Sequence, residues 1–385
     1  MRKLFRRKTL KIIGFQIVIA IVLLVLTDFL LWQFSPVDPE GTRKTIHQTL
    51  PGVRKTIIYE RNVFGFRSLS MRQQEKPSNT IRIFCLGSST TDQVTQSTED
   101  TFYGILEKEL NETFKDSKFR IEMVGYGRGG WKAIDTLAWV KTNLEAYDPD
   151  VVITLMGVND LAWNGGSGYS LETFEERLGQ REDEERKNGA VLLLEEYSQL
   201  YRRSVFARRR LKLWRHRNDG KVFGWHSRQL PKLREKYKQW PYVARPARNP
   251  DPIDEFSRAM NALLGLLQER RISVIVLGQA VLWNDSMSKE EVDSLWFGVG
   301  TPEGRVRASG SWLESEMHRY DRVQERLALH HGAIYVDLDT QIPKTLEYYF
   351  DDCHSTDLGS RKTASAIFPI VKELIEEMEG HRAFQ

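Results

Sequence analysis

Five short apolar runs along the chain have the length and composition of buried β-strands. Runs without polar alternation are typical of parallel strands that are covered on both faces. The runs are IRIFCLG at 81–87, FRIEMVG at 119–125, VVITLMG at 151–157, ISVIVLG at 272–278 and AIYVDL at 333–338. Helical stretches separate most of them, at 101–114, 131–145, 254–271 and 313–330. Strands that alternate with helices in this way predict a doubly wound α/β architecture with a parallel sheet.

This alternation stops between Asp160 and Asp251, where a charged, Arg-rich and helical segment intervenes. We interpret residues 161–250 as an insertion on the domain that serves as a lid or as a flap facing the membrane. Its most basic part runs from Tyr197 to Arg217 and interleaves apolar with basic residues. That pattern fits a solvated helix that packs by one face. It also fits a helix that lies on an anionic membrane or grips an acidic polymer.

The most apolar stretch of the chain runs from Ile12 to Trp32, and its polar interruptions are Gln16, Thr27 and Asp28. A stretch of this length can span a bilayer as a helix. Basic residues crowd the preceding segment, which predicts a cytoplasmic N-terminus and export of the bulk of the chain. No small-residue cleavage site follows, so a retained anchor is favoured over a cleaved signal peptide. The sequence therefore predicts a single-pass protein of the cell membrane, with its main domain on the periplasmic or extracellular side.

These patterns divide the chain into four parts. Residues 1–11 form a basic cytoplasmic tail, residues 12–32 the transmembrane anchor, and residues 33–80 a linker and lead-in. The linker is rich in Pro, Arg, Gln and Ser and has few periodic apolar runs. Residues 81–380 form the main domain, which carries the insertion at 161–250 and is long enough to bury a substantial core.

The composition is that of a globular protein. Hydrophobic residues make up 41% and charged residues 28% of the chain, which argues against long disorder. The formal net charge is only +4, and Lys and Arg concentrate in two short stretches, so charge does not imply a nucleic-acid partner. The two cysteines, Cys85 and Cys353, are too few for a disulfide-dense scaffold or a four-cysteine zinc site. We expect them to be buried free thiols.

Gly-rich and polar turns follow three of the predicted strands, and an acidic turn with a histidine lies near the C-terminus. In open α/β sheets, ligands bind beyond the carboxyl ends of the strands, so these turns are the first candidates for a site. Together they supply every group that acyl transfer needs, although each alone fits an ordinary loop. The turns are Gly87 to Thr91, Gly125 to Gly130, Gly157 to Asp160 and Asp351 to His354.

The chemistry of these residue types indicates a serine nucleophile. The hydroxyl of Ser89 must lose its proton to a base, and His354 has a pKa in the required range. Asp351, three residues before His354, can fix the tautomer of that imidazole and stabilise its charged form. The oxyanion of the tetrahedral intermediate needs hydrogen-bond donors, each contributing roughly 3 kcal/mol. We predict the backbone N–H groups of Ser89 and Gly127 and the side-chain amide of Asn159.

The order of these blocks resembles that of the SGNH (GDSL-like) hydrolase superfamily, over about residues 61 to 375. The matching blocks are Gly87-Ser88-Ser89, Gly127, Gly157-Val158-Asn159-Asp160 and Asp351 to His354, with a lead-in NVFGFRS at 62–68 similar to that of anchored, exported members. The resemblance implies a three-layer α/β/α, flavodoxin-like fold and a serine esterase without cofactor or metal. Two positions depart from the family pattern: Ser88 replaces a frequent aspartate and Gly125 a frequent asparagine.

Other site types fit less well. Gly125-x-Gly127-x-x-Gly130 also matches a dinucleotide fingerprint, but it does not follow the first strand of the domain, and it leaves the serine, asparagine and histidine blocks unexplained. The Gly-x-Ser-x-Gly elbow of α/β-hydrolases is absent from the sequence. The histidines show no convincing spacing for a metal site.

The expected substrate is a carboxylic ester, with O-acetyl groups on an envelope polysaccharide first and a short-chain lipid ester second. Acetyl transfer and a non-catalytic binding role stay open, because transfer and hydrolysis share the acyl-enzyme. Trp131 and Trp163, near the oxyanion blocks, fit either a sugar or acyl pocket or the core. The sequence gives no oligomeric state.

Overall fold

The computed structural model describes residues 2–34, 42–162, 174–204, 207, 224–247, 251–301 and 303–383. Its centre is a five-stranded parallel sheet in the order β4-β3-β5-β6-β9. The strands are β3 (Thr80–Gly87), β4 (Arg120–Gly127), β5 (Val151–Leu155), β6 (Ser273–Leu277) and β9 (Ile334–Val336). The predicted α/β fold with a parallel sheet is therefore confirmed, and each strand coincides with a predicted apolar run.

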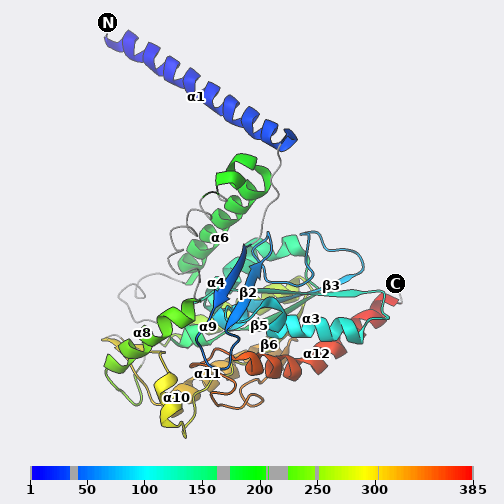
Figure 1. Cartoon of the computed structure of the whole chain (residues 1–385), viewed down its shortest axis with the longest axis vertical. Helices are drawn as coiled ribbons and strands as arrows, with labels where there is room; N and C mark the ends of the chain where they lie inside the picture. The colour runs from blue at the N-terminus through cyan, green and yellow to red at the C-terminus, as the bar shows by residue number, and fades with distance from the viewer. Residues whose placement is uncertain are drawn as a thin grey trace. The chain divides into compact units, whose positions relative to one another are not determined.

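Helices cover this sheet (Figure 1). The long helices are α3 (Phe102–Thr113), α4 (Ala133–Asn143), α9 (Ile253–Glu269), α11 (Gly310–His330) and α12 (Asp357–Ala383). They form two packed groups, with α3 against α12 in one and α9 against both α4 and α11 in the other. Every residue of β3 and β5 is buried, as a sheet covered on both faces requires.

Further elements, both short and long, complete the described structure. The helices are α2 (Ser89–Asp92), α5 (Val158–Leu161), α6 (Phe174–Tyr197), α8 (Trp225–Gln239) and α10 (Lys289–Ser294), with 3-10 turns η1 (Thr98–Asp100) and η2 (Leu144–Tyr147). Two antiparallel hairpins pair β1 (Thr42–His47) with β2 (Thr56–Arg61), and β7 (Val299–Thr301) with β8 (Gly304–Val306). The first hairpin lies in the predicted linker, where its strands TRKTIH and TIIYER are too polar to give a long apolar run.

The lead-in to the first sheet strand is built into the domain through Arg67. This side chain is 0% exposed, and its backbone N–H donates to the carbonyl of Gly125 on β4 at 3.0 Å. Its guanidinium donates to the carbonyl oxygens of Asp92, of Gln93 at 2.8 Å and of Gln96 at 2.7 Å. Arg67 therefore holds the turn that follows Ser89, and the lead-in is part of the site's framework.

Replacing Arg67 with methionine is expected to lower the free energy of unfolding by about 3–5 kcal/mol, because three buried carbonyl groups lose their donor. Urea unfolding of the full chain in detergent measures this change. The control is Arg72→Met, at an exposed arginine whose guanidinium donates to the carbonyl of Leu69 at 2.9 Å. We expect that control to change stability by about 0.5 kcal/mol or less. Equal losses in the two variants would contradict the role of Arg67.

The chain divides into two compact units. The first comprises Met1–Glu40 and Lys187–Gly220, and the second comprises Gly41–Arg186 and Lys221–Gln385. Part of the predicted insertion thus groups with the N-terminal segment, whereas α8 belongs to the unit that contains the sheet. Most of the basic stretch from Tyr197 to Arg217 lies outside the described residues.

The first unit contains α1 (Arg2–Phe34). Large apolar side chains of this helix are exposed, among them Phe15, Leu24 and Phe29. The carboxylate of Asp28 accepts hydrogen bonds from Ser198 Oγ at 3.0 Å and from the backbone N–H of Leu200 at 2.7 Å. Among the described residues, no helix combines the length and the apolarity that a membrane crossing requires.

Candidate active site

The predicted nucleophile lies at the carboxyl end of the central strand β3. Ser88 has extended backbone angles and caps α2, so that Ser89 is the first residue of that short helix. The preceding Gly87 permits the tight approach of the neighbouring strand, since a Cβ there would lie 2.1 Å from the carbonyl oxygen of Leu155. The turn therefore presents the Ser89 side chain at the edge of the sheet where ligands bind in this architecture.

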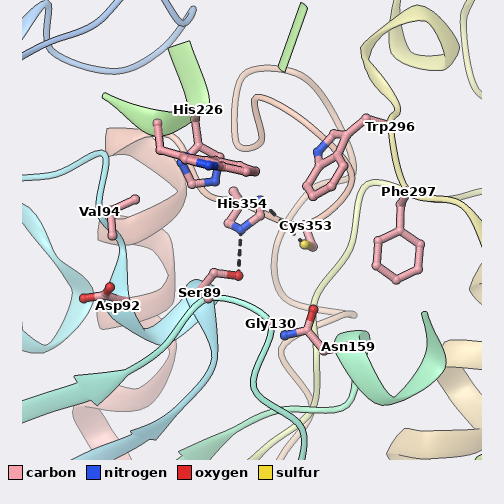
Figure 2. Close-up of a pocket in the computed structure, with 12 residues that line it drawn as sticks. Ser89, Asp92, Val94, Gly130, Asn159, His226, Trp296, Phe297, Cys353 and His354 are labelled. Atoms are coloured by element: carbon pink, nitrogen blue, oxygen red, sulfur yellow. Dashed lines mark hydrogen bonds between the residues drawn. The ribbon is translucent and has the colours of Figure 1, made fainter. Parts of the chain in front are cut away.

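The structure brings Ser89, His354 and Asp351 into one chain of hydrogen bonds. His354 Nε2 lies 2.9 Å from Ser89 Oγ (Figure 2). His354 Nδ1 lies 2.9 Å from each carboxylate oxygen of Asp351. The three residues come from two places 262 or more positions apart, and the fold gives them the geometry of a nucleophile, a base and an acid that orients the base.

Asp351 is fully buried, and several donors hold it in place. Its oxygens accept hydrogen bonds from the backbone N–H groups of His354 at 2.9 Å and Cys353 at 3.1 Å. The indole Nε1 of Trp296 donates another at 2.9 Å. Burial opposes the charge, but His354 and these donors hold the pKa of Asp351 below its usual range. Burial likewise opposes protonation of His354, yet the Asp351 carboxylate keeps the pKa of the imidazole well above its usual range.

Two of the three predicted oxyanion residues line the cavity next to Ser89 Oγ. Ser89 and Asn159 both line a cavity of about 520 Å³, and the Asn159 amide uses one N–H to bond the carbonyl of Trp131 at 2.9 Å. Gly127 is not among the residues that line this cavity; Gly129 and Gly130 are. Gly130 has φ +83°, a conformation that favours glycine.

Gly127 is instead explained by packing. It is the last residue of β4 and pairs with Gly87 on β3. A Cβ at Gly127 would lie 2.2 Å from the carbonyl oxygen of Ser88, so only glycine lets β4 approach the nucleophile turn. Its own carbonyl accepts a hydrogen bond from Arg61 at 3.0 Å. Gly127 and Gly130 belong to the same Gly-rich turn, and their spacing in the sequence did not distinguish the packed position from the one that faces the cavity.

Aromatic side chains that the sequence did not single out form the walls of the cavity. Trp225 and His226 come from α8, and Trp296 and Phe297 from the segment after α10. The Trp296 ring lies parallel to the His354 ring, with centroids 6.5 Å apart and planes at 10°. Because Trp296 also donates to Asp351, it contacts both residues that activate the serine.

Trp131, one of the two tryptophans named from the sequence, does not form these walls. Trp131 lies outside the cavity lining and packs edge-on against Tyr126, with ring centroids 5.5 Å apart. The guanidinium of Arg128 lies over its ring at 5.0 Å. Trp163 lies outside the described residues. Of the two roles predicted for Trp131, lining a pocket or packing in the core, packing is therefore the one observed.

The nucleophile turn is also held by charge. Asp92, the last residue of α2, is buried, and its carboxylate lies 2.7 Å from the Arg61 guanidinium. Arg61 ends β2, so the hairpin that precedes the domain contacts the turn that carries Ser89.

The two cysteines form no disulfide. Cys85 and Cys353 are buried free thiols, as predicted. Burial raises the pKa of both thiols, which disfavours the reactive thiolate.

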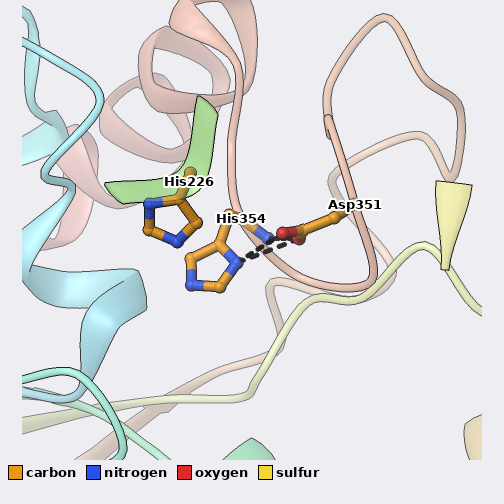
Figure 3. Close-up of side chains that lie close together, drawn as sticks. All are labelled: His226, Asp351 and His354. Carbon is orange, nitrogen blue, oxygen red and sulfur yellow. Dashed lines mark hydrogen bonds and ion pairs between the residues drawn. The ribbon is translucent and has the colours of Figure 1, made fainter. Parts of the chain in front are cut away.

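Two groups of potential metal ligands occur among the described residues. In the first, ligand atoms of His226, Asp351 and His354 lie within 4.8 Å of one another (Figure 3), but Asp351 and His354 already bond each other. In the second, which contains Asp339, the ammonium of Lys344 lies 2.7 Å from the carboxylate. Neither group therefore presents three ligand atoms with unused lone pairs. The second group consists of Glu314, His318 and Asp339.

Asp160, the last residue of the Gly-x-Asn-Asp block, bonds the start of α4. Its carboxyl accepts a hydrogen bond at 3.1 Å from the backbone N–H of Ala133, the first residue of α4. The side chain is buried, and burial raises its pKa to about 7. The folded chain therefore holds this proton more tightly than the unfolded chain does, so the stability it confers is present at low pH and is lost as the pH rises through about 7.

Asp160→Asn is expected to remove the loss of stability that accompanies the ionisation of Asp160 at rising pH. Between about pH 4 and pH 7, the free energy of unfolding of the variant should fall less steeply than that of the wild type, by up to about 1.4 kcal/mol per pH unit. Urea unfolding at several pH values measures the two slopes. Parallel curves for the two proteins would show that Asp160 does not carry the shifted proton.

The chain was also compared with known proteins. Residues 85–362 match the GDSL-like Lipase/Acylhydrolase family. Among solved structures, an acetyl xylan esterase shares 14% identity, with 76% of this chain and 100% of that chain covered and a TM-score of 0.41. The acetylxylan esterase from Geobacillus stearothermophilus shares 13%, covering 75% and 93%, with a TM-score of 0.41. An α/β hydrolase from the metagenome of Lake Arreo, Spain, shares 14%, covering 75% and 94%, with a TM-score of 0.41. No curated protein matches the chain.

Proposed function

Because the chain belongs to the GDSL-like lipase/acylhydrolase family and is a carboxylic ester hydrolase, we propose that it acts through an acyl-enzyme on Ser89. The observation that carries this proposal is the continuous hydrogen-bonded chain from Ser89 Oγ through the His354 imidazole to Asp351, with 2.9 Å at each step. This hydrogen-bonded series of side chains lies at a cavity that is large enough for a small acyl group and part of an alcohol.

In the proposed reaction, His354 Nε2 takes the hydroxyl proton while Ser89 Oγ attacks the ester carbonyl carbon. The carbonyl oxygen becomes an oxyanion, and the proposed donors to it are the backbone N–H groups of Ser89 and Gly130 and the second N–H of the Asn159 amide, since all three residues line the cavity. Collapse of this intermediate breaks the bond to the alcohol, which leaves with the proton from His354. Water then attacks the acyl-serine with His354 again as base, and the acid is released. Throughout, Asp351 holds the imidazole in one tautomer and stabilises its charged form.

The proposed substrate is an O-acetyl ester on a polysaccharide. The cavity walls combine the indoles of Trp225 and Trp296 with polar groups at Ser89 and Asn159. Sugars present both C–H faces, which pack on aromatic rings, and hydroxyl groups, which bond polar side chains. A short-chain lipid ester would use the aromatic walls alone and is the second substrate class to test.

The proposal also includes attachment to the cell membrane through α1, with the sheet domain on the exported side. It is supported by the basic residues at the N-terminal end of α1 and by the exposed apolar side chains along this helix. Carbonate extraction of membranes from cells that make the full chain tests it. Retention of the chain in the membrane fraction is expected, and complete release into the soluble fraction would refute the attachment.

The substrate proposal is tested by acetate release from the full chain in detergent. O-acetylated polysaccharides, short-chain glycerol esters and an aryl acetate are compared, with Ser89→Ala as the blank for each. We expect the aryl acetate to give the highest kcat/KM, the polysaccharide the second highest and the glycerol esters the lowest. Preference for the glycerol esters would move the function to lipid, and acetate that appears on an added sugar acceptor instead of in solution would establish acetyl transfer. Folded chain with no Ser89-dependent turnover on any ester would refute the proposed function.

Asn159→Ala is expected to lower kcat by about 10²–10³-fold with a smaller change in KM, because the amide acts on charge that develops in the transition state. Steady-state kinetics on the aryl acetate measures both constants. The control is Asn143→Ala at the end of α4, whose amide bonds the carbonyl of Trp139 at 3.2 Å outside the cavity. An equal effect in both variants, or a rise in KM alone, would remove Asn159 from the oxyanion site.

A further inference from the structure

His226 lies against the proposed catalytic histidine but belongs to none of the family blocks. It is the second residue of α8, is 5% exposed and lines the cavity together with Ser89 and His354. Its ring centroid lies 4.7 Å from that of His354, with the planes at 65°. A segment interpreted from the sequence as an insertion thus supplies a second imidazole at the reacting centre.

Helix α8 is fixed to the framework of the triad. Arg234, two turns after His226, donates to the carbonyl of Phe350 at 2.8 Å and to that of Ser294 at 2.9 Å. Phe350 immediately precedes Asp351, so the same hydrogen bond ties α8 to the loop that carries the acid. The N-terminal end is held by the backbone N–H of Gly224, which donates to the carbonyl of His47 at 3.0 Å. These contacts tie the segment that carries His226 to the loop that carries Asp351 and to the β1 strand.

The imidazole of His226 is uncharged and lacks a protein partner at its buried nitrogen. Burial, together with the charge of His354, lowers the pKa of His226 to about 3. Nδ1 is buried without a hydrogen-bond partner. Figure 3 shows the other ring nitrogen directed toward His354, on the side of the cavity. The nitrogen that a ligand in the cavity can reach is therefore this second one, and a neutral imidazole offers one hydrogen-bonding position there.

Aromatic surface lies beside this polar nitrogen. Trp225, the preceding residue, is 48% exposed, and its ring lies edge-on to His226 with centroids 4.9 Å apart. The Trp296 ring lies 6.4 Å from that of Trp225. The first turn of α8 therefore offers an accessible indole face and a neutral hydrogen-bonding group within one residue of each other, next to the atom that protonates the leaving alcohol.

We infer that His226 and Trp225 bind the alcohol half of the ester, and that this half is a sugar ring. The inference rests on the proposed esterase function and names the residues that would recognise its substrate. A sugar hydroxyl can bond the neutral imidazole while a C–H face of the ring covers the indole. An alkyl alcohol would cover the indole but leave the imidazole nitrogen dehydrated and unpaired, and sites of this kind reject ligands that lack the matching polar group.

His226→Phe tests this assignment, because phenylalanine keeps an aromatic ring against His354 and removes both nitrogens. The kinetics of the full chain in detergent are compared on an acetylated monosaccharide with unblocked hydroxyls and on an aryl acetate. We expect kcat/KM for the sugar ester to fall about tenfold or more relative to that for the aryl acetate, mainly through KM. The matched control is His330→Phe, at an exposed histidine ending α11, which should leave both substrates and their ratio unchanged.

The outcomes separate this inference from the function on which it rests. Equal losses on the two substrates, carried by kcat, would make His226 a positioning residue for His354 and overturn its assignment to the alcohol. No change in the ratio, with Trp225→Ala also without effect on it, would overturn the sugar site while the esterase function stands. Absence of Ser89-dependent turnover in the wild type on either ester would instead refute the esterase function itself.

Discussion

Ser89→Ala is expected to reduce kcat on an aryl acetate by about 10⁶-fold, to the small residual rate that the oxyanion donors and binding can provide. The reason is that the proposed acyl-enzyme forms on this oxygen, which lies 2.9 Å from the His354 base. Steady-state assays at high enzyme concentration, with circular dichroism to establish folding, measure the effect.

The neighbouring Ser88→Ala is the matched control. Its hydroxyl is buried and lies 3.2 Å from Thr90 Oγ1, away from His354. We expect its rate to stay within about tenfold of the wild type, since one neutral hydrogen bond is lost at no reacting atom. A Ser89→Ala protein that keeps wild-type turnover, or a Ser88→Ala protein that loses it, would move the nucleophile elsewhere.

Asp351→Asn should lower kcat by about 10⁴-fold, the effect that loss of the orienting carboxylate has in serine proteases. The same substitution should change the pH profile. The Asp351 carboxylate keeps the pKa of His354 well above its usual range, and the imidazole acts as base only when it is deprotonated. Wild-type kcat/KM should therefore rise with pH through that high pKa, and removal of the negative charge should move the acid limb to lower pH.

Asp352→Asn distinguishes this effect from general damage to the loop. Asp352 is equally buried, but its carboxylate bonds Trp283 Nε1 at 2.9 Å and the backbone N–H of Trp296 at 2.9 Å instead of His354. We expect the variant to keep the wild-type acid limb and to lose about tenfold or less in kcat. An acid limb that shifts in Asp352→Asn, or one that stays in place in Asp351→Asn, would separate the pKa of His354 from Asp351.

The fold was predictable because its sheet is buried on both faces. Strands such as Val151–Leu155 are buried at every residue and apolar at all but Thr154, so they stand out from the polar helices and loops. The family resemblance followed from the turns after these strands, and the match over residues 85–362 confirms it. The esterase class could therefore be predicted from short local blocks and their order along the chain, without any knowledge of side-chain positions.

The parts that sequence reasoning missed depend on distant contacts. Residues 42–61 form a hairpin with partly exposed, largely polar strands, and the Arg61 that ends it reaches Asp92 only in the folded chain. His226 and Trp296 stand in segments with no recognisable motif, and only the packing of α8 and of the loop after α10 brings them to His354. The one available signal was a Trp-His pair at the start of a helical stretch.

The glycine of the proposed oxyanion site illustrates the same limit at shorter range. Gly127 and Gly130 lie three residues apart in one turn, and both positions demand glycine for physical reasons. At Gly127 the reason is a carbonyl 2.2 Å from where a Cβ would stand, and at Gly130 it is a φ of +83°. A sequence shows that glycine is present but not which of these two requirements it meets.

The most direct test of the account is chemical detection of the acyl-enzyme. The full chain in detergent is mixed with excess aryl acetate, quenched in acid during turnover and digested, and the peptides are mapped by mass spectrometry. We predict one acetyl group per chain, on Ser89, formed in a burst and absent from the Ser89→Ala protein. Turnover that proceeds with no acetylated Ser89, at a rate that the Ser89→Ala variant matches, would contradict the mechanism.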